Sequence, residues 1–217
     1  MKPVVTVVDY GLGNLFSVGH ALEHVGASVV VADSPALIKS AQYLVLPGVG
    51  SFSNGMAGLE QRGLVEPLQE YARCGRPFLG ICLGMQMMFE VSEEFGLHRG
   101  LGLIPGRVVP ISPSGKDGRP HKIPHIGWNE LVVPGNSHRW EGTLLSGITS
   151  SSPVYFVHSF TAVPSREEHR LADCYYDGCL ISAAVGLGNM YGCQFHPEKS
   201  GPVGLRMLAN FINGSLS

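Results

Sequence analysis

The sequence has little charge of either sign and few aromatic residues. Charged residues make up 15% of the 217 residues and aromatic residues 8%, and the formal net charge is only −2 at pH 7. A near-neutral chain lacks the basic surface that binds nucleic acid or an anionic membrane, so we expect neither partner. No apolar run approaches the roughly 18 residues of a membrane-spanning helix. The first ten residues also lack the small-residue cleavage site of a signal peptide.

Paired cysteine motifs and metal motifs are missing too. The five cysteines, at positions 74, 82, 174, 179 and 193, include no Cys-x-x-Cys pair, so we expect neither a disulfide framework nor a zinc site. The chain has no H-E-x-x-H, and no G-K-[ST] follows its glycine-rich loops. Residues 9–14 do not fit the dinucleotide pattern G-x-G-x-x-G. We therefore expect no metal and no cofactor, and free thiols suggest a cytoplasmic protein.

Short apolar runs alternate with amphipathic segments in the first half of the chain, which predicts a parallel sheet with helices on both faces. Hairpin-like spacing in the second half predicts a mixed sheet, and no linker divides the chain, so we expect a single domain over 1–217. Strands are expected at 4–8, 28–32, 43–46, 77–81, 107–111, 130–133, 154–157, 172–176, 180–184 and 190–194. Helices are expected at 15–25, from 35, after 51 with an interruption near Pro67, at 83–90, and at 202–211 with Ser200 as the cap.

The segment Gly80-Ile81-Cys82-Leu83-Gly84 has the pattern of a nucleophile elbow, with cysteine where serine is usual. A nucleophile on a tight strand-to-helix turn is strained, and glycines two residues before and after it let the backbone pass. The helix N-terminus favours a thiolate at Cys82, and the N–H group of Leu83 can face an oxyanion. The alternative is that Cys82 is only a small buried apolar residue.

A thiol nucleophile needs a base, and His196-Pro197-Glu198 follows an expected strand near the C-terminus. In an extended segment, side chains two residues apart point the same way, so Glu198 can hold one ring nitrogen while the other faces the thiol. The alternative is a solvated histidine and glutamate at a strand end.

The loop Pro47-Gly48-Val49-Gly50-Ser51 also follows an expected strand. Its small residues allow a ligand close to the backbone, and the N–H group of Val49 could complete an oxyanion hole with that of Leu83. An ordinary turn is the alternative.

Together these segments resemble the class I, or triad, glutamine amidotransferases. Further motifs make the set similar to the glutaminase subunits of imidazole glycerol phosphate synthases: Asp9-Tyr10-Gly11-Leu12-Gly13-Asn14, Pro124-His125-Ile126-Gly127-Trp128-Asn129 and Tyr155-Phe156-Val157-His158-Ser159-Phe160. The resemblance implies a flavodoxin-like three-layer α/β fold and hydrolysis of glutamine to glutamate and ammonia through a cysteine thioester. It also implies a heterodimer with a (β/α)8-barrel cyclase that uses the ammonia in histidine biosynthesis.

The resemblance further implies roles for individual residues. Cys82, His196 and Glu198 would be catalytic, and Leu83 and Val49 would form the oxyanion hole. Gly50, Gln86, His158 and Ser159 would bind glutamine, and Tyr10, Asn14, Trp128 and Asn129 would face the partner. The alternatives are the glutaminase of another synthase (pyridoxal phosphate or anthranilate), a non-catalytic binding relative, or a cysteine hydrolase that ignores glutamine.

Overall fold

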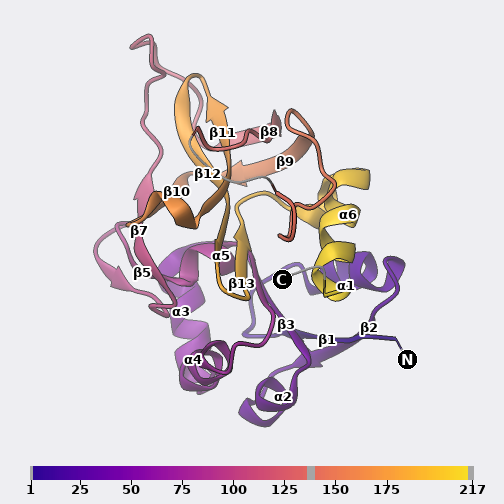
Figure 1. Ribbon diagram of the computed structural model, residues 1–217. Helices are drawn as coiled ribbons and strands as arrows, with labels where there is room; N and C mark the ends of the chain where they lie inside the picture. The colour runs from indigo at the N-terminus through magenta and orange to yellow at the C-terminus, as the bar shows by residue number, and fades with distance from the viewer. Residues whose placement is uncertain (1, 136–139, 215–217) are drawn as a thin grey trace.

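The computed structural model describes residues 2–135 and 140–214, and its centre is a seven-stranded sheet in the order β11–β12–β13–β4–β3–β1–β2 (Figure 1). Five neighbouring strands, from β13 to β2, are parallel, and β11 and β12 pair antiparallel at one edge. The mixed, mostly parallel sheet is therefore confirmed. The strands are β1 Val4–Val8, β2 Ser28–Ala32, β3 Tyr43–Gly48, β4 Phe78–Cys82, β11 Arg170–Tyr176, β12 Cys179–Leu187 and β13 Met190–Cys193.

Helices cover both faces of this sheet, as expected for three layers. Helices α1 and α6 contact each other and share one apolar core, whereas the apolar residues of α2, α3, α4 and α5 belong to a second core. Figure 1 shows the sheet between these two groups. The helices are α1 Leu15–His24, α2 Pro35–Ser40, α3 Phe52–Gln61, α4 Val65–Arg73, α5 Leu83–Met87 and α6 Gly201–Ile212. No helix in the described ranges is long and apolar enough to cross a bilayer.

The central strands are apolar on both faces because both faces are buried. In β3, Val45 belongs to the core under α1 and α6, and its neighbours Leu44 and Leu46 belong to the other core. This alternation follows from the two-residue period of a strand. The apolar run of β3 is therefore a central strand, whereas the run of β2 lies at the sheet edge with Val31 50% exposed.

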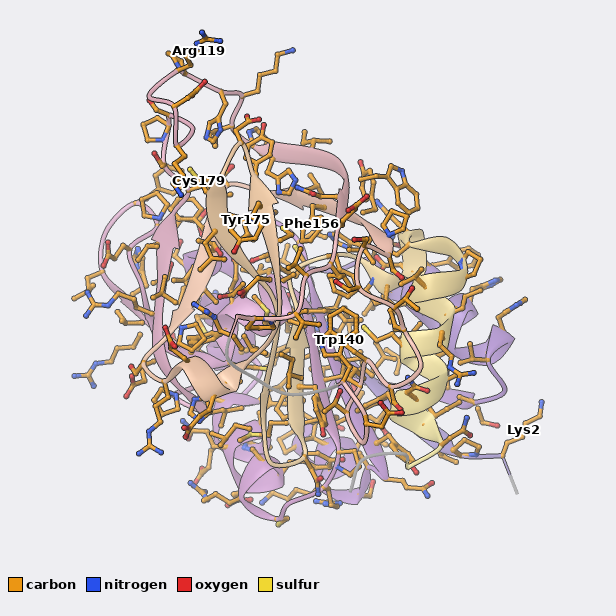
Figure 2. All side chains as sticks on the ribbon, turned by 45° about the horizontal axis from the view of Figure 1, so that its top comes forward. Lys2, Arg119, Trp140, Phe156, Tyr175 and Cys179 are labelled. Carbon is orange, nitrogen blue, oxygen red and sulfur yellow. The ribbon has the colours of Figure 1, made fainter. Side chains whose placement is uncertain are left out.

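Two small sheets flank the central one. The first has the order β10–β7–β5–β6, and the second is the antiparallel pair β8–β9. A loop between β7 and β8 projects beyond the β11–β12 hairpin, with Arg119 near its tip (Figure 2). These strands are β5 Phe89–Ser92, β6 His98–Arg99, β7 Ile104–Pro110, β8 His125–Glu130, β9 Pro153–His158 and β10 Phe160–Pro164.

The helix expected at 83–90 is too long. Helix α5 ends at Met87, because the carbonyl oxygens of Met87 and Met88 accept hydrogen bonds from the backbone of Leu101 and Leu103 instead of continuing the helix. Phe89 then begins β5.

Two further expectations need correction. The strand expected at 130–133 is wrong, because the strand is β8, paired with β9, and only Val132 downstream makes an isolated bridge, to Asp173. The helical interruption lies between α3 and α4, and Pro67 is inside the first turn of α4. A missing N–H group costs nothing in a first turn, since that group has no partner within the helix.

Candidate active site

Cys82 occupies the sharp turn between β4 and α5, with φ of 53° and ψ of −111°. A positive φ is strained for a residue with a side chain, and such strain gathers at functional sites. The flanking glycines are necessary: a Cβ on Gly84 would overlap the carbonyl oxygen of Leu46, and one on Gly80 would lie 2.7 Å from the backbone of Met85. The elbow geometry expected from the sequence is therefore present.

The order of the sheet brings the other segments to this turn. Strand β13 is the parallel neighbour of β4, with Cys193 opposite Ile81, so the chain leaving β13 passes beside Cys82. Strand β3 lies on the other side, with Gly48 opposite Cys82 itself. The thiol is therefore flanked by the His196 segment and by the glycine-rich loop.

His196 and Glu198 form a buried pair. The distance from Nδ1 of His196 to Oε1 of Glu198 is 2.8 Å, and the two side chains are 3% and 1% exposed. The pairing is as expected but its backbone is not extended, since Glu198 lies in a single 3-10 turn, Pro197–Lys199. Ser200 Oγ donates to the His196 carbonyl and accepts from the N–H group of Tyr155, so it holds this turn and its side chain does not cap α6.

The charge on His196 is set by its neighbours. Burial alone would lower its pKa, but Cys82 and Glu198 beside it raise that pKa to about 10. The imidazole is thus protonated at neutral pH in this arrangement, and an adjacent imidazolium favours the thiolate form of a cysteine. Among the described residues, Nε2 of His196 has no hydrogen-bond partner, so this nitrogen is available for proton transfer.

A pocket of about 350 Å³ opens over the thiol. It brings together residues expected to be catalytic, to form the oxyanion hole and to bind glutamine. Its walls are Val49, Gly50, Cys82, Leu83, Gln86, Glu94, Pro124, Val157, His158, Ser159, Phe160 and His196.

Gly48 explains how the glycine-rich loop comes so close to the elbow. A Cβ on Gly48 would lie 2.9 Å from both Leu83 Cβ and the backbone nitrogen of Gly84. Gly50 has a φ of 97°, a conformation that favours glycine. Val49 and Leu83 therefore line the same pocket as the thiol.

Gln86 and His158 use most of their polar groups within the protein. Nε2 of Gln86 donates to the carbonyl oxygen of Phe160 at 3.0 Å and to Oε1 of Gln194 at 2.9 Å, which leaves the Gln86 oxygen for a ligand. The His158 ring contacts Phe160 O at 2.8 Å and His125 Nδ1 at 3.0 Å. Burial lowers the pKa of His158 to about 3, so the ring is neutral, and the backbone of this segment is what remains for a ligand.

Glu94 is a pocket residue that sequence reasoning missed. Its carboxylate accepts a hydrogen bond from the N–H group of Phe52, the first residue of α3, and it is the only carboxylate among the described lining residues. The side chain is 8% exposed. The sequence offers no signal for it beyond two adjacent acids, Glu93 and Glu94, in a glycine-rich stretch.

The four residues expected to face a partner lie outside the pocket lining. Trp128 is 57% exposed on β8, and Asn129 donates to the carbonyl of Tyr175. Asn14 caps α1 through its side chain. Tyr10 is only 2% exposed beside Gly48, because its ring fills the second core, so its side chain is not at the surface as a partner-facing role requires.

The described residues contain no cluster of three or more side chains that could hold a metal ion. The groups at the site are the Cys82 thiol, the imidazoles of His158 and His196, the carboxylates of Glu94 and Glu198, the Gln86 amide and backbone groups.

Comparison with known proteins shows which family this sequence resembles. The profile of the family "Glutamine amidotransferase class-I" matches residues 6–214. The chain is 56% identical over 208 residues to the imidazole glycerol phosphate synthase subunit HisH 1 of Legionella pneumophila (strain Lens), covering 96% of this chain and 98% of that protein. It is 48% identical over 209 residues to the subunit HisH of Desulfitobacterium hafniense (strain DSM 10664 / DCB-2), covering 96% and 93%.

Solved structures share the fold at low identity. PurLQS from Thermotoga maritima superposes with a TM-score of 0.70 at 21% identity, covering 98% of each chain. A structure described as a glutamine amidotransferase superposes with a TM-score of 0.72 at 15% identity, covering 97% of this chain and 98% of that one. These likenesses bear on the fold alone and agree with the expected three-layer α/β architecture.

Proposed function

Because the chain belongs to the class I glutamine amidotransferase family, and within it to the HisH subunits of imidazole glycerol phosphate synthase, we propose that it hydrolyses glutamine and passes the ammonia to a cyclase subunit. The observation that carries this proposal is the positive-φ elbow at Cys82 sharing one pocket with His196, whose ring is paired with the buried Glu198. A free thiol and a protonated imidazole in one pocket suit acyl transfer from an amide.

In the proposed reaction, the thiolate of Cys82 attacks the side-chain amide carbon of glutamine. The resulting oxyanion is held by the N–H groups of Leu83 and Val49. His196 gives its proton to the departing nitrogen, which leaves as ammonia, and an acyl thioester remains on Cys82. His196 then takes a proton from water as the water attacks the thioester, which releases glutamate, and Glu198 keeps the ring oriented and stabilises its charge.

The pocket supplies groups for the amino-acid end of glutamine. We assign the α-ammonium group to the carboxylate of Glu94, because a buried carboxylate favours a cation as its partner. The oxygen of Gln86 can accept from a second substrate N–H group. Gly50 and the backbone of Ser159 line the remaining wall, and His158 supports that wall through Phe160.

The proposed cyclase partner, a (β/α)8 barrel, would bind where the ammonia must leave without contact with water, since protonation removes the lone pair of ammonia. Asn14 borders a narrow gap behind the triad, together with His196 and Glu198. Trp128 and Ile126 are exposed apolar residues on the same face of β8, and contiguous apolar surface of this kind marks protein interfaces. We therefore place the partner over Asn14, Trp128 and Asn129, and we assign Tyr10 a supporting position beneath Gly48.

The chain is proposed to work in a reducing compartment, the cytoplasm. All five cysteines are free, and Cys74 is exposed. An oxidised nucleophile could not attack an amide, so the activity itself requires reduced thiols.

The proposal is tested by glutamate release from glutamine, measured for the chain alone and with the cyclase and its nucleotide ligand. We expect release to rise with the partner and to vanish in Cys82→Ala, whereas Cys74→Ala, which changes an exposed thiol, should keep the rate. A glutamine-analogue electrophile should label Cys82 alone. Glutamate release by Cys82→Ala, or labelling at Cys74 in its place, would exclude the proposed chemistry.

A further inference from the structure

Gln194 is a fully buried amide that follows β13 and lies between a pocket residue and the thiol. Its Oε1 accepts from Nε2 of Gln86 at 2.9 Å, and its Nε2 is 3.7 Å from Sγ of Cys82. Its backbone N–H group donates to the carbonyl of Ala183 on β12, which fixes the residue to the sheet. Gln194 is thus held rigidly against the sulfur of Cys82.

The orientation of the Gln194 amide follows from the carbonyl oxygen of Phe160, which can accept hydrogen bonds but cannot donate them. The carbonyl oxygen of Phe160 accepts from Nε2 of Gln86, so the nitrogen of that side chain must face Phe160. The second proton on the same nitrogen then meets Gln194, which must present its oxygen. The nitrogen of Gln194 is consequently turned toward Cys82.

The thiol and the thiolate need different neighbours. A protonated Cys82 can donate to the carbonyl oxygen of Val157, which is 3.9 Å from Sγ. Once Cys82 has lost its proton, the thiolate can only accept hydrogen bonds, and the Val157 carbonyl oxygen cannot donate one. The N–H group of Gln194 can donate, and within the described residues the sulfur is its only acceptor.

We propose that Gln194 is a hydrogen-bond donor to the Cys82 sulfur, oriented by Gln86, and that it stabilises the thiolate in addition to the positive charge of His196. This inference rests on the proposed function, in which Cys82 is the nucleophile. Hydrogen bonds to a charged acceptor are about twice as strong as neutral ones, and a buried site lacks water to replace a lost donor. Gln86 would therefore have two roles: its oxygen faces the substrate, and its nitrogen orients the Gln194 amide that donates to the nucleophile.

The test uses the full chain and the rate at which iodoacetamide, a neutral electrophile, alkylates Cys82 as the pH is raised. Mass spectrometry of the peptide that contains Cys82 separates this thiol from the other four. Gln194→Met keeps the length of the side chain and removes its donor. The matched control is Gln69→Met, because Gln69 donates one amide bond, to the Leu101 carbonyl at 2.9 Å, outside the pocket.

We expect the midpoint of the alkylation profile to rise by about one pH unit in Gln194→Met, which is about a tenfold loss of thiolate below the midpoint. The control should leave the midpoint unchanged. Should Gln194→Met fail to fold, Gln86→Met replaces it, since it leaves Gln194 in place and removes the bond that orients its amide, together with the Gln86 bond to the Phe160 carbonyl. That variant should raise the midpoint by a smaller amount.

An unchanged midpoint in a folded Gln194→Met, or in Gln86→Met where it serves as the substitute, overturns the proposal. The proposal is also overturned if the control Gln69→Met raises the midpoint by as much as Gln194→Met does. Glutamine hydrolysis is measured on the same samples, and alkylation does not depend on it. If the midpoint rises in Gln194→Met but the unmodified chain does not hydrolyse glutamine even with its partner, the role of Gln194 is supported and the proposed function is rejected.

Discussion

We expect the buried histidine pair, His125 and His158, to make the stability of this protein fall steeply as the pH is lowered. The two rings are 2% and 6% exposed, and Nδ1 of His125 lies 3.0 Å from Nε2 of His158. Burial lowers the pKa of His125 to about 4 and that of His158 to about 3. The unfolded chain protonates both near pH 6.5, so between about pH 6.5 and 4 it binds two protons that the folded chain does not. The contribution of this pair to stability is therefore full above pH 6.5 and decreases as the pH falls, by up to roughly 2.7 kcal/mol per pH unit.

The substitution His125→Phe isolates half of this effect. A phenyl ring can keep the stacking on Phe156 and Tyr176, whose centroids are 4.9 and 4.1 Å from the His125 ring, but it leaves the buried Nε2 of His158 without a donor. At neutral pH we expect a loss of about 1–2 kcal/mol in the free energy of unfolding. The variant also loses one of the two protonation steps, so its stability falls more slowly in acid, and the two curves should cross near roughly pH 5.5.

Urea unfolding at a series of pH values, with the chain and the variant side by side, measures both curves. Carboxylates that titrate in the same range affect the two proteins equally and cancel in the difference. Parallel curves, with the variant less stable by a constant amount throughout, would show that His125 takes up its proton in the folded state and would refute the reasoning.

Three further predictions concern the elbow, the pocket and the partner surface. Gly84→Ala forces a Cβ into the carbonyl of Leu46, so we expect a loss of at least about 2 kcal/mol in urea unfolding; a stability equal to that of the unmodified chain would contradict the elbow packing. Glu94→Gln removes the carboxylate assigned to the substrate ammonium, so KM for glutamine should rise about tenfold or more while iodoacetamide still reacts with Cys82; an unchanged KM would reject that assignment. Trp128→Ala removes an exposed aromatic residue from the proposed interface, so calorimetry should show cyclase binding weakened at least about tenfold; unchanged binding would place the partner elsewhere.

The hydrogen bonds around the thiol connect residues that are far apart in the sequence. Gln86 follows the elbow directly, Phe160 begins β10, and Gln194 follows β13. The contact between Gln86 and Gln194 depends on β13 lying beside β4, whereas the contact between Gln86 and Phe160 joins the central sheet to the separate sheet that contains β10.

The sequence alone was sufficient for features that depend on neighbouring residues. The glycines at 80 and 84, two residues on either side of Cys82, predicted the elbow, and the apolar run at 43–46 predicted a strand that is buried on both faces. The motifs at Cys82 and at His196 with Glu198 pointed to the family that the comparisons confirm. Steric limits between nearby residues and the burial of a strand can both be recognised from the pattern of residues in the sequence.

Only the tertiary structure could decide which distant groups meet. Strand β13 pairs beside β4, and this pairing carries His196 and Gln194 to the thiol. The position of Glu94 in the pocket, the burial of Tyr10 and the location of β8 upstream of the expected strand depend on packing between elements. Such contacts arise from the arrangement of the sheet as a whole, and a single sequence carries no local pattern that records them.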